Sequence, residues 1–163
     1  MISPLRVCLA FALLWLLLPV LAFATSFTGK VVQISDGDTI QVLRDGRAEK
    51  VRLAGIDCPE LNQPYGQAAK RFVLQIAAQR TVTVQVVTTD RYGRTVGEVV
   101  LPDGRSLNQE LVRAGYAWWY RKYSDDAVLE ALEAEAGGAR RGLWEEMDPV
   151  PPWEWRRMQR NVL

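Results

Sequence analysis

Three short segments of the sequence place carboxylates and arginines close together. They are residues 36–39 (Asp-Gly-Asp-Thr), residues 51–60 (VRLAGIDCPE) and residues 90–94 (Asp-Arg-Tyr-Gly-Arg). Carboxylates can bind a hard cation or take a proton from water, and guanidinium groups bind phosphate through paired donors. Each segment alone is typical of an ordinary turn. Together they hold the side chains that chemistry on a phosphate group would need.

The sequence contains no histidine. Because histidine is the commonest general base and the commonest zinc ligand, Ser-His-Asp, Cys-His and histidine-ligated zinc chemistry are excluded. Cys58 is the only cysteine beyond the apolar N-terminal stretch, which contains Cys8. Any catalysis must therefore use carboxylates, Arg, Lys, Tyr or a hard metal ion held by oxygen.

The pattern of apolar residues predicts an α+β fold. β-branched and alternating stretches predict five strands, at residues 27–34, 39–43, 50–56, 81–87 and 94–101. Helical spacing predicts helices at 67–78, from the capping box of Ser106 and Gln109 to Gly115, and from about 124 to 138. Three strands, a helix, two strands and two helices suggest strands that close into a small barrel.

The second and third predicted strands would form a hairpin. A turn centred near Arg47 and Ala48 pairs residues whose numbers sum to about 95, which sets Asp38 opposite Asp57. Two facing carboxylates repel each other, and a cation between them would relieve the repulsion. Without nitrogen ligands, the oxygen donors favour Ca²⁺ or Mg²⁺. Strict alternation puts Arg52 on the other face of the strand from Asp57, so the pattern alone does not bring this arginine to the pair.

The three segments in this order resemble the staphylococcal nuclease-like, or thermonuclease, family. The shared motifs are Asp-Gly-Asp-Thr, Arg-Leu-x-x-Ile-Asp-x-Pro-Glu and Asp-x-Tyr-Gly-Arg, and the resemblance covers residues 27–144. It implies an OB-fold, a five-stranded β-barrel with three α-helices. It also implies a calcium-dependent nuclease that cuts DNA or RNA, as an endo- or exonuclease, and leaves 3′-phosphate ends.

The resemblance implies a metal site. Asp38 and Asp57 are expected to ligate one Ca²⁺ ion, together with the backbone carbonyl of Cys58. The best-known members of the family have threonine at this third position. Because a soft thiolate is a poor partner for calcium, the Cys58 side chain is expected to be a packing group that the site tolerates and not a metal ligand.

The resemblance also implies three catalytic residues. Glu60 is expected to orient or deprotonate the attacking water, and Arg52 and Arg94 to grip the scissile phosphate. Charge grows at phosphorus during attack, and two guanidinium groups with a divalent cation would stabilise it. A bend near Gly55 would be needed to bring Arg52 to the site.

Two further segments contain candidate substrate-binding residues. Arg91 and Tyr92 are candidates for binding a neighbouring phosphate, with ordinary turn residues as the alternative. Residues 118–123 (WWYRKY) mix aromatic and basic side chains, as a base-stacking surface does, or else supply tryptophans to the core. Tyr120 and Tyr123 are the better binding candidates, because a phenol can stack and still hydrogen-bond. The solvated face of the third helix is expected to carry Glu130, Glu133 and Glu135.

The first 24 residues have the pattern of a secretory signal peptide. Arg6 precedes an apolar run that ends at Ala22-Phe23-Ala24, so we expect cleavage after Ala24 and a secreted or periplasmic protein, with an uncleaved anchor as the alternative. Arg6 is the only charged residue of this segment, and residues 25–163 hold 19 basic and 19 acidic side chains. Bulk charge would therefore not attract nucleic acid, and phosphate recognition has to be local.

The chain thus divides into a signal peptide (1–24), a nuclease-like domain (25–144) and a C-terminal tail (145–163). We expect a monomer without stable membrane association after cleavage. The main hypothesis is an exported calcium-dependent nuclease. One alternative is an OB barrel that binds single-stranded nucleic acid without cutting it; another is an envelope protein whose tail residues Trp153 and Trp155 dock a partner. The enzyme is favoured because the chain has Asp38, Arg52, Asp57, Glu60 and Arg94 together.

Overall fold

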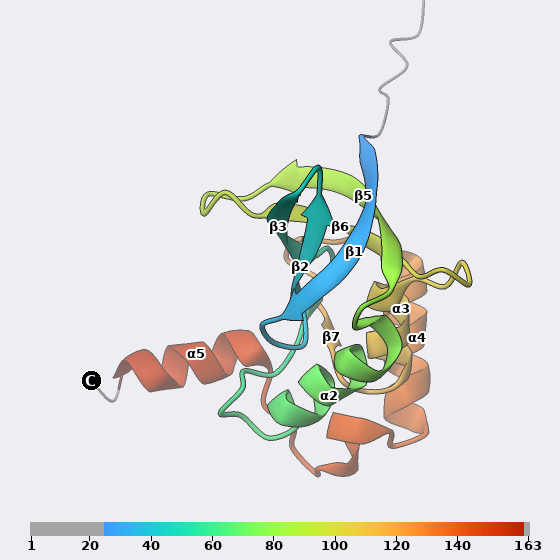
Figure 1. The fold of residues 1–163 in the computed structure, drawn as a ribbon. Coiled ribbons are helices and arrows are strands. Elements are labelled where there is room, and N and C mark those ends of the chain that lie inside the picture. The colour runs from blue at the N-terminus through green and yellow to red at the C-terminus, as the bar shows by residue number, and fades with distance from the viewer. Residues whose placement is uncertain (1–24, 162–163) are drawn as a thin grey trace, which may run out of the picture.

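A closed five-stranded barrel forms the centre of the protein. The computed structural model describes residues 25–161, and Figure 1 shows the barrel above a group of helices. The strand order is β1-β2-β3-β6-β5, with β3 and β6 parallel and the other neighbours antiparallel. The strands are β1 (Ser26–Ile34), β2 (Thr39–Arg44), β3 (Arg47–Leu53), β5 (Thr81–Thr89) and β6 (Thr95–Val100). The predicted α+β fold with an OB-type barrel is confirmed.

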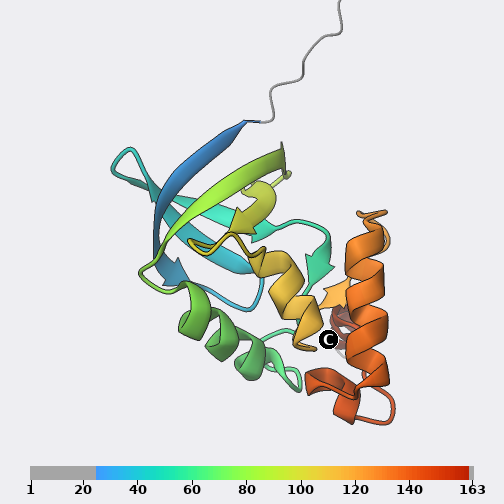
Figure 2. The same ribbon diagram turned by 90° about the vertical axis from the view of Figure 1, so that its right-hand side faces the viewer.

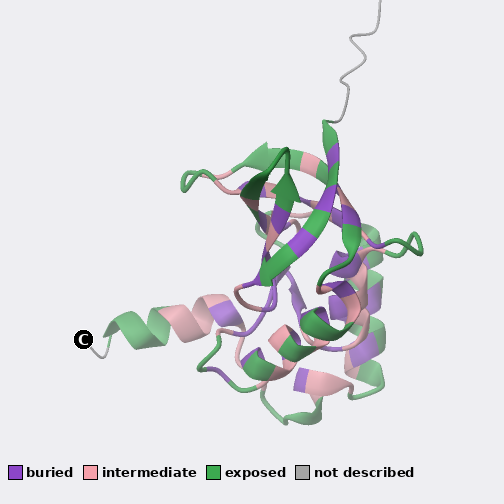
Figure 3. Ribbon diagram, in the orientation of Figure 1, coloured by how far each residue is buried: buried purple, intermediate pink, exposed green. Residues whose placement is uncertain are grey.

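β-branched side chains fill the barrel. Alternate residues of the strands point inward, so the buried residues in Figure 3 recur along each strand between exposed ones. At two points the backbones pack too closely for any side chain. A Cβ on Gly29 would lie 2.2 Å from the carbonyl oxygen of Leu43, and one on Gly97 would lie 2.6 Å from that of Gln85. The fully buried barrel residues include Val31, Ile40, Val42, Val51, Val84 and Val99.

The helices gather at one end of the barrel, as Figure 2 shows for α2, α3 and α4. They are α2 (Gly66–Ala77), α3 (Leu107–Arg113) and α4 (Ala127–Gly138), followed by a 3-10 helix, η2 (Gly142–Glu145). The predicted cap of α3 is present, because the Ser106 side chain accepts a hydrogen bond from the N–H of Gln109. α4 begins slightly later than predicted, since the carboxylate of Asp126 accepts the N–H of Val128 and so caps the helix.

The predicted hairpin register is wrong. β2 and β3 are joined by a tight turn at Asp45 and Gly46, where φ is 48° and 77°. Asp-Gly readily adopts the two left-handed conformations that a two-residue hairpin turn needs, so the turn lies before Arg47 rather than at it. Thr39 therefore pairs with Arg52, and Asp38 does not face Asp57.

The third predicted strand is broken at Gly55. β3 ends at Leu53, Gly55 has a φ of 72°, and a short strand β4 (Ile56–Asp57) pairs with β7 (Trp118–Trp119) instead of continuing the barrel. A Cβ on Gly55 would lie 2.9 Å from a methyl carbon of Leu129, so glycine is required for space as well as for conformation. This is the bend that the resemblance called for near Gly55.

The predicted tail contains a further helix, α5 (Pro152–Asn161), beyond the three that were predicted. It extends to one side of the barrel in Figure 1. The chain before it is tied to the domain, because Nε2 of Gln63 donates to the carbonyl of Val150 over 2.6 Å. Within residues 25–161, no helix is both long and apolar enough to cross a membrane. The predicted signal peptide lies outside the described residues.

Candidate active site

Arg52 joins two carboxylates where the barrel meets the helices. Its Nη1 lies 2.7 Å from Oδ2 of Asp38, and its Nη2 lies 2.8 Å from Oδ1 of Asp57. Asp38 comes immediately before β2, Arg52 is in β3, and Asp57 ends β4. The bend at Gly55 turns the chain back so that Asp57 reaches Arg52. The two aspartates are thus brought together through one guanidinium and not by facing each other across a hairpin.

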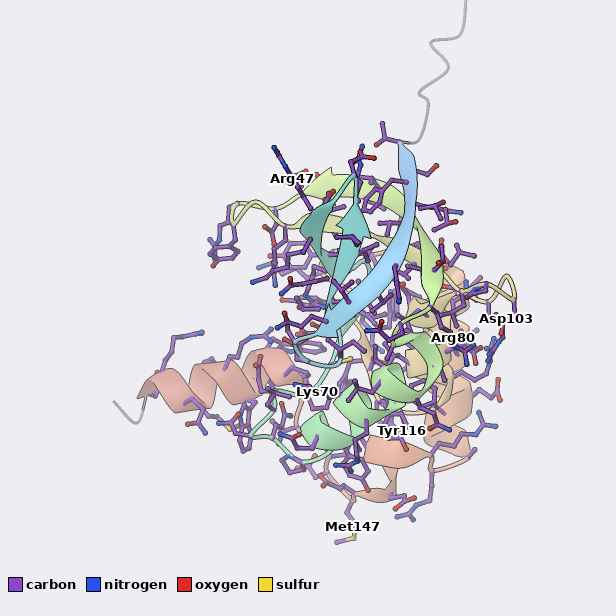
Figure 4. All side chains as sticks on the ribbon, viewed as in Figure 1. Arg47, Lys70, Arg80, Asp103, Tyr116 and Met147 are labelled. Atoms are coloured by element: carbon purple, nitrogen blue, oxygen red, sulfur yellow. The ribbon has the colours of Figure 1, made fainter. Side chains whose placement is uncertain are left out.

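The loop before β2 aims the Asp38 carboxylate. Oδ2 of Asp38 accepts a hydrogen bond from the N–H of Cys58 over 2.7 Å, and the N–H of Asp38 donates to Oδ1 of Asp36 over 3.1 Å. A Cβ on Gly37 would come within 2.8 Å of side-chain carbons on either side, so only glycine fits there. Lys70 of α2, labelled in Figure 4, holds the start of the loop by donating to the carbonyl of Ser35. The Asp-Gly-Asp motif therefore forms a fixed loop.

Burial and crowding perturb the charges of this cluster. Burial, together with the neighbouring charge of Asp38, raises the pKa of Asp36 to about 6. Burial also raises the pKa of Asp57, although a hydrogen bond from Arg156 opposes the rise. The pKa of Arg52 is raised because Asp38 and Asp57 outweigh the opposite effect of burial. The site holds more carboxylate than Arg52 alone can neutralise, which favours binding of further positive charge.

Glu60 lies beside Asp57 in the loop after β4. Its N–H donates to Oε1 of Gln63, and its carbonyl accepts the N–H of Gln63, so the loop is held on both sides. Nη1 of Arg156 lies 2.7 Å from Oε1 of Glu60 and 3.3 Å from Oδ1 of Asp57. Because one nitrogen reaches both, the two carboxylates flank the same point. The Glu60 side chain is 40% exposed and thus open to solvent.

Arg156 is the residue of the site that sequence reasoning missed. It is on α5, and its Nη2 also lies 2.7 Å from Oδ2 of Asp57. The predicted tail was treated as a separate feature. Helical spacing was the available signal, because Trp153 and Arg156 are three residues apart and so share one face of a helix.

Cys58 points into the core. Its side chain is buried, and it is a free cysteine. Burial raises the pKa of the thiol well above its ordinary value, and the charge of Asp38 adds to the rise. The sulfur is therefore a neutral packing group beside Gly37.

Arg94 is held apart from the cluster. Its Nε lies 2.7 Å from Oδ2 of Asp90, whose other oxygen accepts the N–H groups of Tyr92 and Arg94. Within residues 25–161, no hydrogen bond or ion pair joins Arg94 to the carboxylates of the site. Parallel pairing of Arg52 with Val96 nevertheless puts Arg94, two residues earlier, on the same face of the barrel as Arg52. The two guanidinium groups can therefore approach one ligand from neighbouring strands.

The candidate substrate residues differ in exposure. Tyr92 is 69% exposed at the tip of the β5–β6 turn, where its hydroxyl accepts a hydrogen bond from Arg91. Tyr123 is 68% exposed. Tyr120 is already stacked on Trp153, with ring centroids 5.2 Å apart and planes 3° from parallel. Of the two later tyrosines, Tyr123 thus offers more free surface.

Trp118 and Trp119 are buried, which agrees with the alternative prediction that these tryptophans belong to the core. The N–H of Trp119 donates to Oε1 of Glu133, and Arg121 pairs with Oε2 of the same carboxylate at 2.5 Å. The prediction that Glu133 lies on the solvated face of its helix is therefore wrong. Burial raises the pKa of this carboxyl group, against the effect of the two donors.

The carboxylate oxygens of Asp38 and Asp57 suit a hard cation, although in this structure they contact guanidinium groups. Within residues 25–161, no three His, Cys, Asp or Glu side chains are arranged to hold a metal ion. Asp38 and Asp57 nevertheless offer the oxygen ligands that calcium prefers. Nη1 of Arg52 is buried and forms an ion pair with Oδ2 of Asp38, but the angles of this contact are not those of a hydrogen bond. The hydrogen-bonding capacity of this nitrogen is therefore unused among the described residues. A cation ligated by both aspartates would have to replace part of the guanidinium contacts.

Residues 50–146 match the family described as staphylococcal nuclease homologue, which is more than half of the chain. The chain belongs to the staphylococcal nuclease family. An uncharacterized endonuclease of Escherichia coli O157:H7 is 48% identical over 128 residues, covering 78% of this chain and 84% of the relative. A micrococcal nuclease of Shigella flexneri is 40% identical over 146 residues, covering 83% and 84%. The protein ParB of Escherichia coli is 42% identical over 143 residues, covering 82% and 81%. The family resemblance drawn from the three motifs is thereby confirmed.

Proposed function

We propose that the protein is an exported, calcium-dependent nuclease that hydrolyses phosphodiester bonds of DNA or RNA and leaves 3′-phosphate ends. The observation that supports this most strongly is the contact of Arg52 with both Asp38 and Asp57, beside Glu60, in a member of a nuclease family. Its relatives described as endonuclease and micrococcal nuclease support the same activity.

In this proposal Asp38, Asp57 and the backbone carbonyl of Cys58 hold the calcium ion. When bound, calcium supplies positive charge to the phosphate under attack. Asp57 is almost completely buried, so its negative charge is poorly screened by solvent and attracts a cation strongly. Asp38 is kept in one orientation by the N–H of Cys58.

Arg52 and Arg94 bind oxygens of the scissile phosphate. Arg94 lies two residues before Val96, the pairing partner of Arg52, and each guanidinium is oriented by a carboxylate, which reduces the entropy lost when phosphate binds. Glu60 accepts the proton of the attacking water. Its exposed side chain and its firmly held backbone suit a group that must meet water at a defined position.

Arg91, Tyr92 and Tyr123 contact the strand on either side of the cut. They are exposed, and aromatic rings can stack on bases without reading the sequence. Tyr120 contributes less, because Trp153 covers one of its faces.

Export rests on the signal-like residues 1–24. Mass spectrometry of the exported protein is expected to find Thr25 at the N-terminus, and a retained Met1 would favour an uncleaved anchor. After cleavage we expect a monomer.

The activity is tested by incubating the purified protein with plasmid DNA and with RNA, in calcium, in magnesium and in excess EGTA. We expect cutting in calcium, less cutting in magnesium, and none in EGTA. Labelling with a kinase that needs a free 5′ hydroxyl then identifies the ends. Full cutting in EGTA would contradict the metal assignment. Binding of single strands without any cutting would favour a non-catalytic OB-fold module.

A further inference from the structure

The C-terminal helix delivers a second guanidinium to the acidic site. Arg156 contacts both oxygens of Asp57, at 2.7 and 3.3 Å, and Oε1 of Glu60 at 2.7 Å. Asp57 also receives Nη2 of Arg52 on Oδ1. Both oxygens of Asp57 are thereby occupied by arginine. A cation that binds this carboxylate competes with the two guanidinium groups, because like charges crowd the same two oxygens.

Arg156 is the one that can leave. Arg52 extends from a barrel strand, and its side chain is 15% exposed, whereas that of Arg156 is 35% exposed. Arg156 is also on the last described helix, which leads away from the barrel. Moving Arg52 would disturb its contact with Asp38 as well, while moving Arg156 breaks only its contacts with Asp57 and Glu60.

A small aromatic contact holds α5 against the domain. Trp153 stacks on Tyr120 and packs edge-on against Trp118, with centroids 5.2 and 5.9 Å apart. The chain just before the helix is fixed by the hydrogen bond from Gln63 to Val150. The start of α5 is therefore held against the domain, while the helix is exposed from Arg157 onward.

We propose that Arg156 is an internal counter-ion for the metal site, and that α5 is a latch: a divalent cation and Arg156 compete for Asp57. In the cation-free protein Arg156 neutralises Asp57 and Glu60. A bound cation takes over Asp57 and releases Arg156, which also frees Glu60 from its ion pair. This rests on the proposed metal site at Asp38 and Asp57.

The test is calcium binding by calorimetry to the full exported chain, with no nucleic acid present. Arg156→Gln is expected to bind calcium about tenfold tighter than wild type, the scale for removing one competing ion pair with a buried carboxylate. Arg157→Gln is the matched control, since it removes the same charge from an exposed neighbour on the same helix. Its affinity is expected to stay within about twofold, because an exposed charge is screened.

A second variant changes the latch without changing charge. Trp153→Ala removes the stacking that holds α5, and it is expected to tighten calcium binding by about two- to fivefold, since such aromatic pairs contribute modestly. Calcium should also speed tryptic cleavage within α5 of the wild type, and the site of cutting is read by mass spectrometry.

Three results would overturn the latch. The first is that Arg156→Gln binds calcium no more tightly than the wild type, and the second is that Arg157→Gln tightens calcium binding as much as Arg156→Gln does. The third is that Trp153→Ala binds calcium no more tightly than the wild type. If no variant binds calcium, the metal assignment falls together with the latch, which distinguishes that failure from failure of the latch alone.

Discussion

Arg52 is the residue on which the acidic site most depends for its stability. Its guanidinium contacts Asp38 and Asp57, and Asp57 is almost completely buried. Removing one partner of a buried ion pair leaves an uncompensated charge. We expect Arg52→Gln to lower the free energy of unfolding in EGTA by about 3 kcal/mol, measured by urea denaturation.

Calcium should restore part of this loss, because the cation supplies the missing positive charge. Arg47→Gln is the control on the same strand. Figure 4 shows Arg47 at the hairpin end of the barrel, pointing into solvent, and its change should leave the free energy of unfolding nearly unaltered. Equal stability of Arg52→Gln and wild type would show that the arginine is not needed to balance the aspartates.

Cys58 should be replaceable. The thiol is buried and neutral, since its pKa is raised well above its usual value by burial. We expect Cys58→Ser to keep its cleavage rate within about threefold of wild type, while the buried hydroxyl lowers the free energy of unfolding by about 1–2 kcal/mol. A cleavage assay and urea denaturation measure the two effects. A hundredfold loss of rate in protein that is folded by circular dichroism would show that the sulfur takes part.

Single residues also show what the sequence could reveal. The motifs identified Asp38, Arg52, Asp57 and Glu60, and the structure brings these four into one connected cluster. Motifs cannot reveal Arg156, because its partners lie 96 and 99 residues away and its position depends on how the tail folds back. Glu133 was misassigned for a similar reason. Helical periodicity did not predict that the N–H of Trp119 would need a buried acceptor.

At the scale of secondary structure, the strands were predicted better than the connections between them. Alternation located all five barrel strands, since alternate residues have to be apolar to fill the barrel. The hairpin register failed because it depended on one choice of turn, and the Asp45–Gly46 turn shifts every pair. No helix was predicted for the tail, although proline is well accommodated in the first turn of a helix and α5 begins at Pro152.

The loop that carries Glu60 is fixed by the start of α2. A Cβ on Gly66 would lie 1.8 Å from the carbonyl oxygen of Glu60. Gly66→Ala must therefore push this loop away, and we expect it to lower both the thermal stability and the cleavage rate. Gly138→Ala is the control, because a Cβ there meets nothing within 4 Å. Differential scanning fluorimetry and the cleavage assay compare the two variants. A wild-type rate in Gly66→Ala would contradict a fixed position for Glu60.

At the scale of the whole molecule, charge is balanced. Residues 25–163 have equal numbers of acidic and basic side chains, so a nucleic acid should be held by a few local contacts. If Arg52 and Arg94 meet the scissile phosphate and Arg91 meets a neighbouring one, the logarithm of affinity for a single strand should fall with the logarithm of salt at a slope of about −1.4.

This slope is measured with calcium-loaded Glu60→Gln protein, which should bind without cutting, over a series of KCl concentrations. A slope steeper than about −5 would show that a broad basic surface binds the strand. That result would favour the OB-fold binding module over a local catalytic site.

The measurement that tests the central claim most directly is the single-turnover cleavage rate of Glu60→Gln with saturating calcium. Glutamine keeps the shape of the side chain but cannot accept the proton of water. The account predicts a rate lower by about 10²- to 10⁴-fold, the range for losing a general base. Substrate affinity should stay near that of the wild type, calcium affinity should not fall, and Glu146→Gln, at an exposed position, should cleave normally. A wild-type rate in Glu60→Gln would contradict the assignment of this cluster as the site that cuts.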